Sequence, residues 1–155
     1  MTLPHLSADG QARMVDVSEK AVTTRIATAA GRLLVNAVVI DALRDGSLPK
    51  GDALAVARIA AISAVKRTSD LLPLCHPLPI TGVDIDLVVG AEAVEITVSC
   101  RADARTGAEM EALTGVCVAG LAVHDMVKAL DPAAVLADVR LLSKSGGRSG
   151  EWTRP

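Results

Sequence analysis

The sequence predicts an α+β fold in which long helices pack on one face of an antiparallel sheet, in a ferredoxin-like arrangement. Several segments alternate apolar and polar residues with the period of strands, and two long aliphatic segments between them favour helices. The chain has 155 residues, the length of one ordinary domain. We therefore predict a single domain over residues 1–155, with flexible ends at about 1–12 and 143–155.

The first part of the chain alternates between extended and helical patterns. Residues 13–17 alternate in polarity and residues 23–29 are rich in β-branched side chains, so both are predicted strands. Asn36 is expected to cap a short helix that runs through Leu43 and is ended by Gly46.

A second helix is predicted from Ala53 to about Arg67, with Asp52 as its cap and Lys50 on the turn-rich loop before it. This helix is apolar nearly all round. Such a helix needs cover on more than one side, which a small domain supplies poorly. We therefore expect a subunit interface there.

The second half of the chain predicts two strands joined by a turn, a long helix and a last strand. Three prolines between residues 70 and 79 exclude a regular helix or central strand in that segment. The predicted elements are strands 83–89 and 94–100 around Gly90, a helix from Glu109 to Ala129, a strand from Val135 to Leu142 and a flexible tail over 143–150.

The composition excludes several classes of protein. Half of the residues are hydrophobic, yet there is no Phe, no Tyr and one Trp, so stacking platforms for single-stranded nucleic acid are missing. Sixteen Lys and Arg against eighteen Asp and Glu give no field that recruits DNA. We expect no nucleic-acid or membrane partner. The N-terminus lacks a signal pattern and the three cysteines fit no paired spacing, which predicts a cytoplasmic protein with free thiols.

The segment around Cys75 and His76 is one candidate for chemistry, because flanking prolines fix its backbone. His76 could contact a phosphate or act as acid or base; equally, it could be a loop histidine satisfied by the backbone. Adjacent Cys and His side chains point apart in an extended chain and have no further ligand at metal-binding spacing. We therefore expect no bound metal.

The long helix carries two further candidates. Asp125 and Lys128 are spaced i,i+3 and share one face, where they could divide base and acid roles or form a simple surface ion pair. Glu109 and Glu111 at the helix start either complement the helix dipole or accept hydrogen bonds from the N–H edge of a guanine-like ring.

Several cations lie at predicted element ends, where they could converge on a polyphosphate or be merely solvated. They are Arg25, Lys50, Lys66, Arg67, Lys144 and Arg148.

Together these segments resemble one family, the cyclic pyranopterin monophosphate synthases (molybdenum cofactor biosynthesis protein C), over essentially residues 5–150. The resemblance rests on blocks that occur in order. They are Met14-Val-Asp-Val-Ser18, Lys50-Gly-Asp52, Ala64-Val-Lys-Arg-Thr68, Asp70-Leu-Leu-Pro-Leu-Cys-His-Pro-Leu78, Thr106-Gly-Ala-Glu-Met-Glu-Ala-Leu-Thr114, His124-Asp-Met-Val-Lys-Ala129 and Leu141-Leu-Ser-Lys-Ser-Gly-Gly-Arg-Ser-Gly150.

The resemblance implies a lyase that converts (8S)-3′,8-cyclo-7,8-dihydroguanosine 5′-triphosphate to cyclic pyranopterin monophosphate and releases pyrophosphate. It implies catalytic roles for Asp125, Lys128 and Lys50, and a homohexamer, a trimer of dimers with active sites at subunit interfaces. No cofactor is required, and Mg²⁺ arriving with the triphosphate is compatible with this expectation. The substrate-binding residues that it implies are Leu74, Cys75, His76, Met110, Glu111, Glu109, Lys66, Lys144 and Arg25.

Two positions depart from the family pattern. His124 stands where the family often has Tyr, and Arg148 stands where it tends to have Lys. Arg148 keeps the charge but cannot transfer a proton. The alternatives are a non-catalytic nucleotide-binding paralogue and a metal-dependent hydrolase that uses Cys75, His76 and His124.

Overall fold

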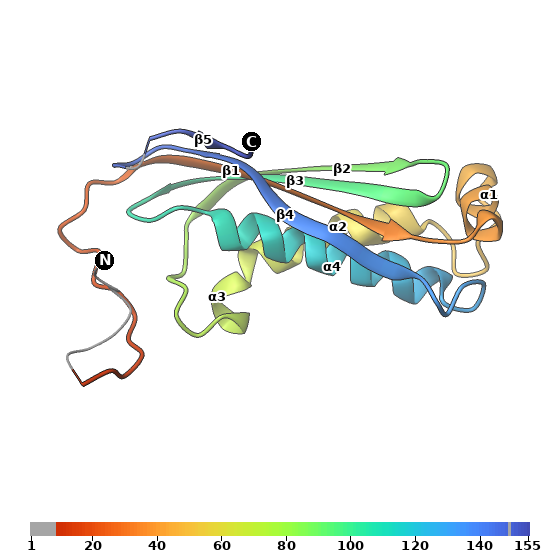
Figure 1. Cartoon of the computed structure of the whole chain (residues 1–155), viewed down its shortest axis with the longest axis horizontal. Coiled ribbons are helices and arrows are strands. Elements are labelled where there is room, and N and C mark those ends of the chain that lie inside the picture. Colours follow the sequence, from red (N-terminus) through yellow and green to blue (C-terminus); the bar gives the residue numbers. More distant parts are fainter. Residues whose placement is uncertain (1–8, 149) are drawn as a thin grey trace.

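The computed structural model describes residues 9–148 and 150–155, which form a five-stranded sheet with a layer of helices beneath it (Figure 1). In chain order the elements are β1 (Thr23–Leu34), α1 (Ala37–Asp45), α2 (Ala53–Lys66), α3 (Thr68–Leu71), β2 (Ile80–Val89), β3 (Ala93–Ala104), α4 (Glu109–Val127), β4 (Val135–Ser145) and β5 (Trp152–Thr153).

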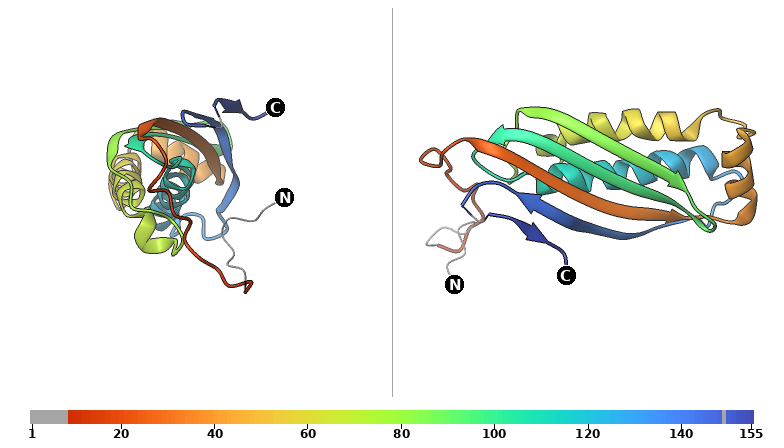
Figure 2. Two further views of the ribbon diagram at one scale, coloured as in Figure 1. Left: turned by 90° about the vertical axis from the view of Figure 1, so that its left-hand side faces the viewer. Right: turned by 90° about the horizontal axis from the view of Figure 1, so that it is seen from above.

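The strand order in the sheet is β2-β3-β1-β4-β5, and every neighbouring pair is antiparallel. The connections β1-α2-β2 and β3-α4-β4 place two crossover helices on one face of the sheet (Figure 2). This is the ferredoxin-like topology, so the predicted fold class is confirmed.

The core lies between the sheet and the two helices α2 and α4. Along β3, Val94, Ile96 and Val98 are fully buried, while Glu95 between the first two is exposed, as the two-residue period of a strand requires. A Cβ at Gly31 in β1 would lie 2.8 Å from Cγ1 of Val116 in α4. A glycine there lets the helix approach the sheet closely.

Local hydrogen bonds fix where the first two helices begin. The Asn36 side chain accepts from the Val39 N–H at 3.0 Å, and Asp52 accepts from the Ala55 N–H at 2.9 Å. Gly46 has φ 71° and ends α1 in the left-handed conformation that glycine favours. The predicted caps are confirmed, and the predicted ends of α1, α2 and α4 fall within two residues of those observed.

The structure corrects the prediction at both ends of the chain. Residues 13–17 do not form a strand, because the Asp16 carboxylate accepts from the Ser18 N–H at 2.8 Å and turns the chain. The tail predicted from Ser143 is wrong in part, since β4 continues to Ser145 and residues 152–153 pair with it as β5. The strand predicted over residues 23–29 is present and extends to Leu34.

Among the described residues, α4 has the length and apolar composition of a membrane-crossing helix. Its inner residues Ala112, Val116, Ala119 and Val123 are nevertheless fully buried under the sheet. Its composition is that of the core helix of this fold.

Candidate functional site

The last turn of α4 carries a group of three charged side chains. Lys128 Nζ donates to Asp125 Oδ1 at 2.7 Å, and Lys50 Nζ donates to Asp125 Oδ2 at 3.1 Å and to the Asp125 carbonyl at 2.7 Å. The i,i+3 spacing of a helix brings Lys128 to Asp125, as predicted. The loop after α1 brings Lys50 to the other carboxylate oxygen. We call these three residues the charged trio.

The trio is exposed, with 58% of the Asp125 side chain, 54% of Lys128 and 43% of Lys50 accessible. Hydrogen bonds from Lys128 and then Lys50 lower the pKa of Asp125 below its ordinary value. Asp125 is therefore an ionised carboxylate at neutral pH, with an ammonium group on each oxygen.

The first turn of α4 borders a cavity of about 590 Å³, which we call the ring chamber. Leu74, Cys75 and His76 form one wall, and Met110 and Glu111 form another. The chain before β1 supplies a third wall through Val15 and Val17.

Glu111 is the more deeply buried of two glutamates that line the ring chamber and is only 4% exposed. Burial raises its pKa, its own backbone N–H opposes the shift, and neighbouring Glu109 adds to it. Burial, reinforced by the charge of Glu111, also raises the pKa of the Cys75 thiol. Within the described residues the structure records no ion pair for Glu111, so its carboxylate is disposed to accept hydrogen bonds from a ligand.

A second cavity of about 630 Å³ adjoins the first, and we call it the cation chamber. Lys144 Nζ donates to Glu109 Oε1 at 2.8 Å, and Arg25, which is 9% exposed, donates to the carbonyls of Ala104 and Gly146 at 3.3 Å each. The chamber is further lined by Lys20, Arg105 and Arg148. Glu109 and Arg148 line both chambers.

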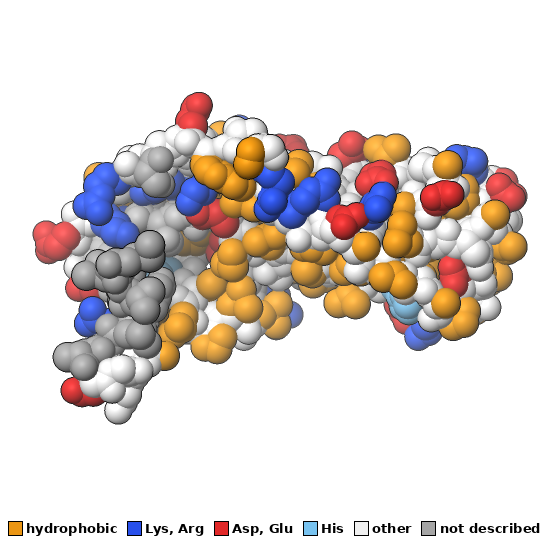
Figure 3. All heavy atoms as spheres, viewed as in Figure 1, with side chains coloured by type: hydrophobic (Ala, Val, Ile, Leu, Met, Phe, Trp, Pro, Cys, Tyr) orange, Lys and Arg blue, Asp and Glu red, His pale blue; other side chains and the backbone are white. Residues whose placement is uncertain are grey.

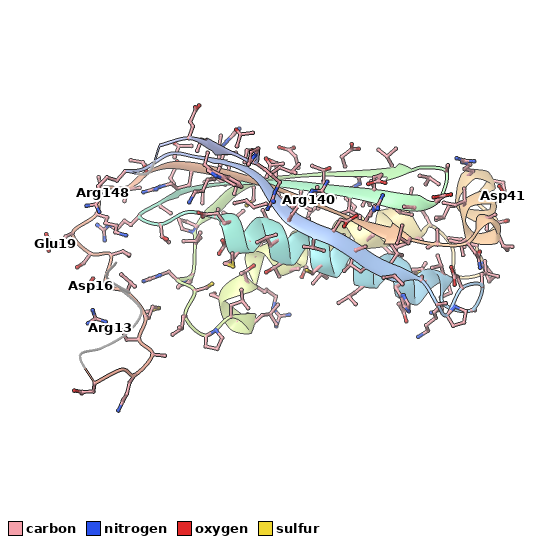
Figure 4. All side chains as sticks on the ribbon, in the orientation of Figure 1. Arg13, Asp16, Glu19, Asp41, Arg140 and Arg148 are labelled. Atoms are coloured by element: carbon pink, nitrogen blue, oxygen red, sulfur yellow. The ribbon has the colours of Figure 1, made fainter. Side chains whose placement is uncertain are left out.

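The chambers and the charged trio lie at opposite ends of the molecule. Figure 4 places Asp16, Glu19 and Arg148 at the chamber end and Asp41 of α1 at the other end. Glu111 and Asp125 are fourteen residues apart on one helix, a separation of about 21 Å along its axis. One copy of the chain cannot bring both groups to one small molecule.

Eight of the nine predicted substrate-binding residues line the two chambers. They are Arg25, Leu74, Cys75, His76, Glu109, Met110, Glu111 and Lys144. The ninth, Lys66, is exposed at the end of α2 and lines neither chamber. Sequence reasoning missed Lys20 and Arg105, which flank the quoted blocks Met14–Ser18 and Thr106–Thr114 and have no distinguishing spacing of their own.

The described part of the chain holds no cluster of three His, Cys, Asp or Glu side chains suited to a metal ion. Cys75 and His76 lie at the chamber end, whereas His124 lies in the last turn of α4. These three residues therefore cannot share a metal within one chain.

The outward face of α4 between the two ends is apolar. Met110, Leu113, Cys117 and Leu121 recur every three or four residues, and Leu121 is 62% exposed. Hydrophobic side chains gather along this lower, helical side of the molecule (Figure 3). The neighbouring helix α2 also carries exposed apolar side chains, namely Val56 and Ile59.

The fold and its paired chambers define a ferredoxin-like α+β protein with a cationic cavity beside a cavity that holds a buried carboxylate. A family model described as the MoaC family matches residues 14–147, and the chain belongs to that family.

Curated relatives match over nearly the whole chain. Cyclic pyranopterin monophosphate synthase from Streptomyces griseus is 59% identical over 152 residues, covering 98% of this chain and 86% of the relative. Cyclic pyranopterin monophosphate synthase 2 from Mycobacterium tuberculosis is 57% identical, with 98% and 91% covered. The synthase from Desulfitobacterium hafniense is 48% identical, with 99% and 95% covered.

Proposed function

We propose that the protein is a cyclic pyranopterin monophosphate synthase of molybdenum cofactor biosynthesis. It acts as a lyase that converts (8S)-3′,8-cyclo-7,8-dihydroguanosine 5′-triphosphate to cyclic pyranopterin monophosphate and releases pyrophosphate. The observation that carries the proposal is the adjoining pair of chambers, because their chemistry matches the two parts of this substrate. Membership of the family and the names of the relatives support the same reaction.

The ring chamber suits the guanine-derived ring. Glu111 offers a buried carboxylate to the N–H groups of the ring edge, while Leu74 and Met110 offer apolar walls. The chain has no Phe or Tyr to stack on the ring. Recognition therefore depends on polar contacts at the ring edge, and Cys75 and His76 stand on the opposite wall to contribute to it.

The cation chamber suits the triphosphate. Arg25 and Lys144 are held in place by hydrogen bonds, and Lys20, Arg105 and Arg148 add charge around the same cavity. Cations placed around the expelled pyrophosphate stabilise the charge that develops as it leaves. Mg²⁺ carried by the triphosphate is compatible with this chamber, and the proposal requires no cofactor.

The charged trio supplies the groups for proton transfer. Asp125 is ionised at neutral pH because of its two lysines, so it can accept a proton, while Lys128 beside it can donate one. Lys50 stabilises negative charge next to the pair. Ring opening and reclosure both need such proton transfers.

We further propose that two copies of the chain complete each site. The apolar face of α4 packs against the same face of a second copy, with the two helices antiparallel about a two-fold axis near Cys117 and Val118. This arrangement brings the charged trio of one copy to the chambers of the other. The charges of the two copies are complementary in this arrangement. Lys50 and Lys128 of one copy approach the end of the other copy that carries Glu109 and Glu111.

Three such dimers form the homohexamer that the family resemblance implies, and the enzyme works in the cytoplasm. Sedimentation of the purified protein at several concentrations measures the assembly directly, and we expect a hexamer whose smallest stable unit is the dimer.

Incubation of the purified protein with the cyclised triphosphate tests the reaction. We expect pyrophosphate and the pyranopterin product in equal amounts. Because the proposal requires no cofactor, the protein should keep full activity after treatment with a chelator that leaves Mg²⁺ on the substrate. Tight binding of the substrate with neither product would identify a non-catalytic paralogue and contradict the proposed function.

A further inference from the structure

The carboxylate of Glu109 occupies the space where Gly107 would carry a side chain. A Cβ built on Gly107 would overlap Oε2 of Glu109 and would lie 2.7 Å from its Cδ. Gly107 belongs to the loop between β3 and α4, and Glu109 is the first residue of α4. The helix therefore begins with its first acidic side chain folded back over the loop.

The same carboxylate holds a cation of the neighbouring strand. Oε1 of Glu109 accepts the 2.8 Å hydrogen bond from Lys144 of β4, and the two side chains are only 23% and 34% exposed. Gly107 and Glu109 both line both chambers, and Lys144 lines the cation chamber. The pair thus stands at the boundary where one chamber meets the other.

We propose that Gly107 is a positioning residue, whose missing side chain seats the Glu109 carboxylate and through it holds Lys144 over the cation chamber. The role of this pair in turnover rests on the proposed function. The seating of Glu109 by Gly107 rests on the geometry alone.

The backbone at Gly107 makes the proposal testable. Its φ lies outside the left-handed range that only glycine adopts easily, so an alanine is tolerated by the main chain. The atoms that a new Cβ would meet are the far end of a flexible side chain, which can swing away without moving the backbone. Gly147 differs, because it has φ 72° and its Cβ would overlap the Arg25 guanidinium. A substitution there would both strain the backbone and displace the Arg25 side chain.

The experiment compares Gly107→Ala with Gly82→Ala, Glu109→Ala and the double variant Gly107→Ala/Glu109→Ala. Gly82 is the matched control, because its φ is also ordinary and its nearest neighbour, the Cβ of Arg101, lies 3.9 Å away. We expect crystals of Gly107→Ala to show Glu109 turned away and its contact with Lys144 broken. In Gly107→Ala the Lys144 side chain is no longer held by Glu109, so the substrate must order it on binding. The kcat/KM of this variant should therefore fall about five- to tenfold, while Gly82→Ala keeps the wild-type value.

The double variant separates positioning from general damage. If Gly107 acts through Glu109, Gly107→Ala causes no further loss of kcat/KM once Glu109 is alanine. Should Gly107→Ala alone fail to fold, folding of the double variant would support the same conclusion, because the colliding carboxylate is gone. The inference is contradicted by an unmoved Glu109 in Gly107→Ala, or by losses that add in the double variant. An inactive wild-type protein would count against the proposed function only, because the position of Glu109 is measured without substrate.

Discussion

The two ends of α4 carry acidic residues in opposite physical states. Asp125 at one end is 58% exposed in its side chain and has two lysine partners, whereas Glu111 at the other end is 4% exposed and has none recorded in the described residues. Lysine hydrogen bonds lower the pKa of Asp125, and burial raises the pKa of Glu111. One helix thus presents an exposed carboxylate whose pKa is lowered and a buried carboxylate whose pKa is raised.

The difference is the reason that we propose a site built from both ends. An exposed ion pair contributes little free energy of folding and excludes no water, so the charged trio of a lone chain resembles an ordinary surface cluster. The chambers have room for a small molecule, and the lysine–carboxylate hydrogen bond that they contain among the described residues is that of Lys144 with Glu109. In the dimer that we propose, α4 packs against the α4 of a second copy, which would cover the trio and bring it to the chambers.

Removal of the trio should have the largest effect. Asp125→Ala and Lys128→Ala each remove a proton-transfer partner, and we expect product formation to fall by about 10³-fold or more. The melting temperature should stay unchanged, since an ion pair that is exposed in the single chain contributes little to the free energy of folding. The dimer should persist, because the apolar face of α4 is intact. Rates of pyrophosphate release and the melting curve are the measurements, and turnover near the wild-type rate would contradict the catalytic assignment.

The next largest effect concerns the apolar face between the two ends. Leu121→Glu places a charge on a face that we propose to be buried between copies, so the dimer should dissociate and activity should fall about 100-fold with it. Val88→Glu is the control, because Val88 is 50% exposed but lies in β2, away from α4. Sedimentation of both variants decides the matter, and an intact dimer in Leu121→Glu would place the interface elsewhere.

A smaller effect is expected on stability and its pH dependence. The raised pKa of Glu111 means that the folded protein loses stability as pH rises from the ordinary glutamate value of 4.5 through the folded-state value. Glu111→Gln removes this loss, so the variant should melt a few degrees higher than the wild type at pH 7, with the gain shrinking toward pH 5. A gain that is independent of pH would show that the buried carboxylate is not its source. Substrate binding should weaken in the same variant.

Much of the fold follows from local signals in the sequence. The caps at Asn36 and Asp52 are short-range hydrogen bonds, and the alternation along β3 records which face is buried. Residues 13–17 show the limit, because alternation alone does not provide a neighbouring strand, and Asp16 turns the chain instead. The continuation of β4 to Ser145 depends on pairing with β1 and β5, which no local pattern in the Gly-rich tail indicates.

The contacts of the candidate site are likewise only partly predictable from the sequence. The pairing of Asp125 with Lys128 follows from helical spacing, whereas Lys50 joins them through a loop whose path is tertiary. Arg105 and Lys20 carry no sequence signal that separates them from other surface cations. The separation of the two groups, in contrast, was implicit in the predicted helix, since residues 111 and 125 of one helix stand about 21 Å apart.

The most direct test of the shared site mixes two inactive proteins. Lys128→Ala disables the trio and Glu111→Ala disables the ring chamber, so neither homodimer has a working site. In a hybrid dimer one site carries both changes and the other carries neither. After dissociation and random reassociation we expect about a quarter of the wild-type rate, because half of the dimers are hybrids and each has one intact site of two. No recovery of activity in a mixture shown to contain hybrids would contradict a site built from both ends of α4 across two copies.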